Sequence, residues 1–113
     1  MVENKSPRER ALYKLIYNFH LMTIVTQLFP LGNVYQTPGV LAAIPSEDVF
    51  QALARHQSGD WGDLDETEKQ ENEFSLGYPL RLFSAYRAQT GVKFWIMTEA
   101  DRSATTVLLP SEY

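Results

Sequence analysis

The spacing of apolar residues changes twice along this chain of 113 residues. Near the start, apolar positions recur every three or four residues, which is the period of an amphipathic helix. These positions are Leu12, Leu15, Ile16 and Phe19. Pro7 and Glu9 precede them, and both residue types favour the first turn of a helix. The pattern predicts a helix from about residue 7 to about residue 20.

The middle of the chain predicts three short elements. Residues 32–37 alternate in character and stop at Pro38-Gly39, which indicates a strand ended by a turn. Residues 40–44 are expected to form a short helical turn. The next segment begins with a proline, a serine and two acids, which predicts a helix with Ser46 as its N-cap. The expected buried stripe of this helix consists of Val49, Phe50 and Leu53 and runs up to His56.

The remaining half predicts an acidic helix followed by a sheet. Asp65 and Glu68 have the spacing of a capping box, so a helix is expected from about residue 65 to about residue 76. Gly77-Tyr78-Pro79 breaks this helix, and the apolar period then switches to two. Turns at Thr90-Gly91 and at residues 100–103 separate three strands. These strands form an antiparallel meander.

Together these elements indicate the α+β class. We expect a small antiparallel β-meander of three or four strands with two or three helices packed on one face. A length of 113 residues corresponds to one domain with one modest core. Polar residues interrupt the apolar stretch between residues 11 and 31, so we expect no membrane-spanning helix. No small-residue cleavage site follows this stretch, so we expect no signal peptide.

The composition narrows the chemistry. The chain has no cysteine, which excludes disulfides, a thiolate nucleophile and cysteine-ligated zinc. This composition suits a reducing environment, and we expect a cytoplasmic protein. His20 and His56 are the only histidines, and the sequence has no calcium-loop pattern. We therefore expect no metal and no cofactor.

Negative charge is concentrated in the middle of the chain. Residues 47–73 contain nine acids and two bases, a charge of −7 within a chain whose net charge is −4. Such a patch repels a phosphate backbone, which disfavours nucleic acid as a partner. Two interpretations remain, a solvated acidic helix face or a negative surface offered to a basic protein partner.

One candidate site surrounds His56. A histidine at the end of a helix, oriented by Asp60 or Asp63, has the composition of a general acid or base. The alternative is a histidine that bonds the last carbonyls of its helix. The segment Asp60-Trp61-Gly62-Asp63 also suits a tight turn in which Trp61 fills a gap between helix and sheet and its N–H finds a carbonyl.

A second candidate site lies at the turn between the last two strands. Arg102 has the chemistry to clamp a carboxylate or phosphate, and Thr105 and Thr106 carry hydroxyl donors. The alternative is a turn at Asp101 and Arg102, followed by threonines that favour a strand. Folding of the meander over the helix end would bring His56 and Arg102 face to face.

A further set of residues matches the pattern of a family. They are Leu31-Gly32, Thr37-Pro38-Gly39, Arg55-His56, Ser58 to Leu64, Asn72-Glu73, Ser84-Ala85-Tyr86, Trp95, Thr98 to Arg102, Thr105-Thr106, Leu108-Leu109-Pro110 and Glu112-Tyr113. On these residues, the segment from Leu31 to Tyr113 resembles small bacterial proteins of plasmids and integrative elements known as plasmid-related proteins. The resemblance implies a mobile genetic element and specifies no reaction.

The family pattern begins just before Leu31, which implies that Met22 is the ancestral start. We therefore expect residues 1–21 to be an N-terminal helical extension and residues 22–113 to be a single α+β domain. The apolar side of the extension is a candidate homodimer contact.

Three functions remain open. The first is a non-enzymatic accessory or inhibitory protein of a mobile element that binds a protein partner. Its candidate binding residues are Trp61, Asp63, Glu66, Glu68, Glu73, Glu99, Asp101 and Arg102. The second is a small metal-independent endoribonuclease that uses His56, Asp60 and Arg102. The third is a domain that binds an anionic ligand through Arg102. We rank them in this order and favour the non-enzymatic one.

Overall fold

The computed structural model describes residues 6, 8 and 27–113. Apart from residue 8, the helix expected over residues 7–20 lies outside the described residues. The boundary at Met22 and the candidate homodimer contact of the extension also lie outside them.

Residues 27–113 form four strands, three α-helices and a terminal 3-10 turn. In chain order these elements are β1 (Asn33–Gln36), α2 (Pro38–Ala43), α3 (Ser46–Gln57), α4 (Glu66–Leu76), β2 (Leu82–Arg87), β3 (Lys93–Thr98), β4 (Ala104–Leu108) and η2 (Pro110–Glu112).

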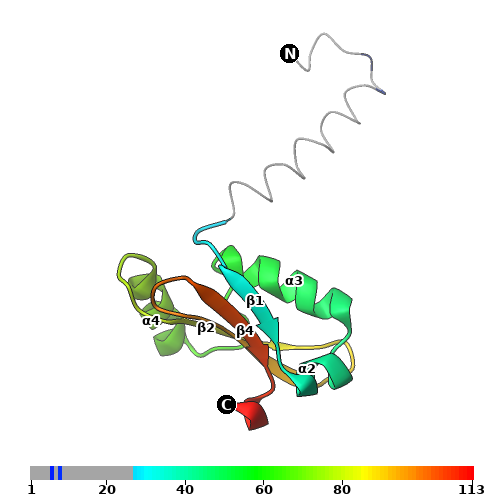
Figure 1. The fold of residues 1–113 in the computed structure, drawn as a ribbon. Coiled ribbons are helices and arrows are strands. Elements are labelled where there is room, and N and C mark those ends of the chain that lie inside the picture. The colour runs from blue at the N-terminus through cyan, green and yellow to red at the C-terminus, as the bar shows by residue number, and fades with distance from the viewer. Residues whose placement is uncertain (1–5, 7, 9–26) are drawn as a thin grey trace.

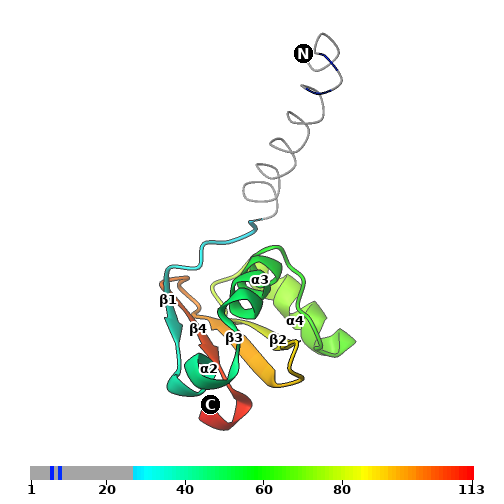
Figure 2. The same ribbon diagram turned by 90° about the vertical axis from the view of Figure 1, so that its right-hand side faces the viewer.

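The strands form one sheet in the order β1-β4-β3-β2 (Figure 1 and Figure 2). β2, β3 and β4 make the expected antiparallel meander, in which Ser84 lies opposite Ile96 and Ile96 opposite Val107. β1 runs parallel to β4, so the complete sheet is mixed. A parallel pair requires a long connection, which the chain from α2 to β3 supplies. The α+β class is confirmed.

The main core lies between the sheet and the helices α2 and α3 (Figure 2). Its buried residues are Val40, Ile44, Val49, Ala52, Tyr86, Ala88, Phe94, Ile96 and Val107. Val49, Ala52 and His56 share the buried side of α3. Phe50, expected in the same stripe, is 77% exposed, so that expectation was wrong. Its position is rotated by about 100° from that of Val49, which turns its side chain away from the sheet.

The two predicted helix starts differ in outcome. Asp65 is the N-cap of α4 and forms both bonds of the capping box with Glu68, as expected. Ser46, in contrast, is the first residue of α3 and not its N-cap. The N-cap is Pro45, because its carbonyl accepts hydrogen bonds from the amides of Asp48 and Val49.

The outer edge of β2 is closed by other parts of the chain. The side chain of Asn72 on α4 accepts from Phe83 N–H at 3.1 Å and donates to Phe83 O at 2.5 Å. Ala85 N–H donates to Trp61 O at 3.3 Å, and Ala85 O accepts from Asp63 N–H at 2.8 Å. An uncovered edge strand invites pairing with another chain. α4 and the loop before it prevent such pairing at β2.

Gly62 makes this closure possible. Its φ of +71° lies in the left-handed region, and a Cβ at this position would overlap Ala85 O. Any larger residue would push the loop away from β2 and break the bonds that cover the edge.

We therefore expect Gly62→Ala to destabilise the protein by about 3 kcal/mol or more, because it adds a steric clash to an unfavourable φ. Gly91→Ala is the matched control, since Gly91 has a φ of +90° and a Cβ there meets no neighbour within 4 Å. It should cost about 1 kcal/mol. Urea unfolding of both variants measures the difference, and equal losses would contradict the role assigned to Gly62.

Candidate functional site

His56 lies within a buried group of polar side chains. The residue is 0% exposed, and its ring contacts Phe29 and Trp61 edge-on. Nδ1 lies 2.5 Å from Ser84 Oγ on β2, and Nε2 lies 2.9 Å from Thr98 Oγ1 on β3. Both nitrogens of the imidazole are therefore bonded inside the protein.

The far end of this group determines where its protons lie. Thr105 donates to the carbonyl of Leu31 at 2.7 Å, because a carbonyl only accepts. Thr98 must then donate to Thr105 across 2.8 Å, since the single proton of Thr105 is already used. It follows that His56 donates from Nε2 to Thr98, and in the neutral ring, which burial favours, Nδ1 accepts from Ser84. His56 is thus the neutral Nε2–H tautomer.

The surroundings of His56 oppose its protonation. Burial, with a smaller contribution from the positive charge of Arg102, lowers the pKa of His56 to about 3. A proton on Nδ1 would also displace the hydrogen bond from Ser84. A general acid or base must reach the proton that it transfers, and the fully buried ring of His56 does not reach solvent. This geometry gives no support to catalysis by His56.

Because the pKa of His56 is lowered in the folded protein, the free energy of unfolding should depend on pH. Unfolded histidine has a pKa near 6.5, so below that pH the unfolded chain binds a proton that the folded chain excludes. The free energy of unfolding should be highest above pH 6.5. It should fall by up to about 1.4 kcal/mol per pH unit as the pH drops toward 3.

Urea unfolding between pH 7 and pH 5, above the range in which carboxylates titrate, measures this slope. The variant His20→Gln leaves His56 as the only histidine in the chain, so nitrogen NMR of its ring reports on His56 alone. We expect an unprotonated Nδ1 throughout this range. A ring that gains a proton between pH 7 and pH 5 would contradict the assignment.

Asp60, the candidate partner of His56, pairs with Arg55 instead. Arg55 Nε lies 2.6 Å from Asp60 Oδ2, and Nη2 lies 3.2 Å from Oδ1. These hydrogen bonds hold the pKa of Asp60 below its usual range. The carbonyl of Asp60 accepts from Tyr86 O–H at 2.7 Å, and the Arg55 guanidinium lies over the Tyr86 ring. Asp60 therefore anchors its loop to the sheet.

Trp61 is also part of the interior. It is 3% exposed and stacks on Phe29 at 6.3 Å between ring centroids. Its indole N–H donates to the carboxylate of Glu73 on α4 at 2.9 Å, where the sequence had suggested a carbonyl. Trp61 and Glu73, both candidate binding residues, are thus bonded to each other and join the loop to α4.

Arg102 binds the chain itself. Its two terminal nitrogens donate, at 2.5–3.3 Å, to the carbonyls of Ser75, Tyr78, Leu80, Glu99 and Ala100. Ser75 and Tyr78 lie at the end of α4, where helix carbonyls favour a cation. The backbone of Arg102 has a φ of +61°, and its side chain lies over its own turn, where Nη1 donates to the carbonyls of Glu99 and Ala100. These bonds leave little capacity to clamp an external anion.

We expect Arg102→Lys to destabilise the fold by about 2 kcal/mol, because a lysine ammonium does not reproduce the planar fork that reaches carbonyls of several segments. Arg81→Lys is the control. Arg81 pairs with Glu99 at 3.5 Å on an exposed surface, so its replacement should change stability little. Thermal unfolding compares the two, and a stable Arg102→Lys variant would reopen the case for an anion site.

The remaining candidate binding residues are acids near the surface. Glu99 pairs with Arg81, and Asp101 accepts from Ser103 N–H within its turn. Glu68 is used in the capping box of α4. Among the described residues, the side chains of Asp63 and Glu66 make no hydrogen bond, so they remain available to a partner.

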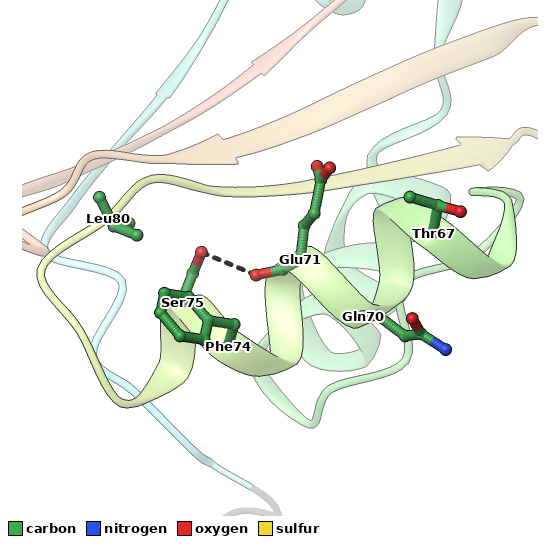
Figure 3. A pocket seen from close by; sticks show the side chains of 6 residues that line it. All are labelled: Thr67, Gln70, Glu71, Phe74, Ser75 and Leu80. Carbon is green, nitrogen blue, oxygen red and sulfur yellow. Dashed lines mark hydrogen bonds between the residues drawn. The ribbon is translucent and has the colours of Figure 1, made fainter.

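The exposed side of α4 carries a groove of about 450 Å³ that the sequence analysis did not identify. Figure 3 shows the six residues that line it, Thr67, Gln70, Glu71, Phe74, Ser75 and Leu80. Beside it, Phe74 and Tyr78 stack at 4.4 Å between ring centroids. Phe74, Tyr78 and Leu80 are 58%, 54% and 46% exposed. The one available signal was Phe74, which with Leu76 is one of only two large apolar residues in α4.

A larger depression of about 680 Å³ lies over β2 and β3. Phe83, Ala85 and Trp95 contribute to its lining. Its remaining lining residues include the acids Asp63 and Glu68 and the bases Arg87 and Lys93. The mixed charge of this surface indicates no particular ligand.

Several comparisons give negative findings. Within residues 27–113 no group of histidine and carboxylate side chains is arranged to hold a metal ion. No described helix has the length and apolar character that crossing a bilayer requires. The chain matches no protein-family model, no curated protein and no solved structure.

Proposed function

We propose that this chain is a non-enzymatic accessory or inhibitory protein of a mobile genetic element, which binds a protein partner in the cytoplasm through the exposed side of α4. The observation that carries the proposal is the stacked Phe74–Tyr78 pair with Leu80, exposed beside a groove. The mobile-element setting rests on the resemblance of residues 31–113 to plasmid-related proteins, and the compartment on the lack of cysteine.

The apolar part of this surface favours a protein partner. Three large apolar side chains that lie together in water have unfavourable hydration, which a partner relieves by covering them. Aromatic residues in such patches commonly supply much of the binding energy. Their stacking also holds the two rings in one arrangement before a partner binds, which lowers the entropy cost of binding.

The charge of α4 specifies the chemistry of the partner. Glu66 and Glu71 lie exposed on the helix, and their side chains make no hydrogen bond within the described residues. A partner with an apolar anchor and flanking lysine or arginine side chains complements this surface.

The groups that a ribonuclease or an anion-binding domain would need are engaged elsewhere. His56, Asp60 and Arg102 are each bonded within the fold. No buried polar side-chain atom of the described residues lacks a hydrogen-bond partner. These observations favour a binding surface over a reactive site.

The decisive experiment compares capture of proteins from a bacterial lysate by immobilised wild type and by Phe74→Ser/Tyr78→Ser, with mass spectrometry. We expect capture of a specific partner to fall at least about tenfold in the double variant. Phe50→Ser is the matched control, because Phe50 is an exposed aromatic residue on α3. Equal loss in both variants, or in neither, would contradict the proposed surface.

Charge reversal and an RNA-cleavage assay complete the test. Glu66→Lys/Glu71→Lys should slow association with the captured partner, most strongly at low salt, while Glu47→Lys on α3 should not. Glu68 and Glu73 are avoided because both have structural bonds. Purified protein should leave RNA intact, and cleavage by wild type that His56→Ala abolishes would overturn the proposal.

A further inference from the structure

The two edges of the sheet differ in whether other parts of the chain cover them. Asn72 and the loop around Gly62 cover the outer side of β2. β1 forms the opposite edge, and Figure 2 shows it on the far side of the sheet from α4. All four residues of β1 are exposed. Within residues 27–113, the sheet therefore has one closed edge, at β2, and one open edge, at β1.

The pairing of β1 with β4 determines which backbone groups the open edge presents. Asn33 N–H donates to Ser103 O, and Thr37 N–H donates to Val107 O, each at 3.0 Å. In a parallel ladder, alternate residues face the same neighbour. The N–H and C=O of Val34 and Gln36 therefore point away from β4, and among the described residues they have no partner.

The side chains of β1 do not discourage pairing. Edge strands are usually protected by charges, prolines or bulges, and the sequence Asn33-Val34-Tyr35-Gln36 has no charged residue and no proline. Val34 is 42% exposed and Tyr35 is 55% exposed, and both residue types favour strands. Beyond the end of β1, Leu41 is 68% exposed and lines a groove of about 450 Å³ that also includes Gln36.

We propose that β1 pairs with β1 of a second copy of this chain, antiparallel about a two-fold axis at Tyr35. In this register Val34 faces Gln36 of the second copy, and their outward groups form two pairs of N–H···O=C bonds. The two Tyr35 residues meet at a non-hydrogen-bonded position, where side chains of an antiparallel pair are closest. No like charges oppose each other across this contact.

The closed edge at β2 explains why the partner is one copy and not many. A protein with two open edges can add copies without end, whereas a two-fold contact through β1, the one open edge of the described sheet, stops at a dimer. The pairing joins two four-stranded sheets into one continuous sheet across the interface.

The first test is the mass of the full-length protein in solution, measured by light scattering across the micromolar range. We expect wild type to be a dimer and Val34→Pro to be a monomer. Proline at position 34 removes an N–H that points outward and leaves the bonds to β4 in place. Phe50→Ser, which removes an exposed aromatic residue elsewhere, should remain dimeric. A monomeric wild type would overturn the proposal.

The second test locates the contact by cross-linking, since the chain has no cysteine of its own. Tyr35→Cys should form a disulfide dimer on mild oxidation, because the two positions face each other within disulfide reach. Val34→Cys should not, because the two copies of residue 34 are out of register and beyond that reach. Preferential cross-linking at position 34 would overturn the register.

A wild-type dimer that survives Val34→Pro would place the contact elsewhere, for example in residues 1–21, and would also overturn the proposal. Loss of partner capture in Phe74→Ser/Tyr78→Ser leaves this contact unaffected, so the two proposals fail independently.

Discussion

The fold depends on the buried polar chain that runs through His56. Ser84, Thr98 and Thr105 come from three different strands, and each bonds the imidazole or a hydroxyl that bonds it. Thr105 also holds the carbonyl of Leu31, just before β1. An unpaired polar group in the interior costs free energy, so these bonds are favourable only when they form together. These hydrogen bonds therefore fix the position of α3 on the sheet. They also join the segment just before β1 to β4.

Those parts of the fold that local chemistry determines could be predicted from the sequence. The capping box at Asp65 and Glu68, the hairpin turn at Thr90-Gly91 and the meander depend on residues that are close in the chain. The parallel pairing of β1 with β4 joins residues about 70 positions apart, and no local pattern specifies it. Phe50 was misplaced for a related reason. An apolar residue at the border of a helix stripe is buried only if the opposing layer extends over it.

The candidate site was harder to predict because the same residue types serve catalysis and internal bonding. A histidine near aspartates, an arginine in a polar turn and a run of threonines have the composition of a reactive site. They equally satisfy the hydrogen bonds of a small domain whose core contains polar groups. The distinction depends on burial and on the partner of each atom. Arg102, for example, has carbonyl acceptors from three separate stretches of chain, and their convergence exists only in the folded protein.

The arrangement of surfaces then bears on how such a protein would act. α4 lies beyond β2, at the opposite side of the sheet from β1 (Figure 2). Pairing through β1 would therefore leave the exposed Phe74–Tyr78 surfaces at the two outer ends of the dimer, where neither hinders the other. Two identical surfaces on one rigid sheet favour a partner that is itself dimeric or repeated, because the second contact then forms within the complex at a high effective concentration. A weak contact at each α4 would suffice for such a partner, which is consistent with a patch built from only three large apolar side chains.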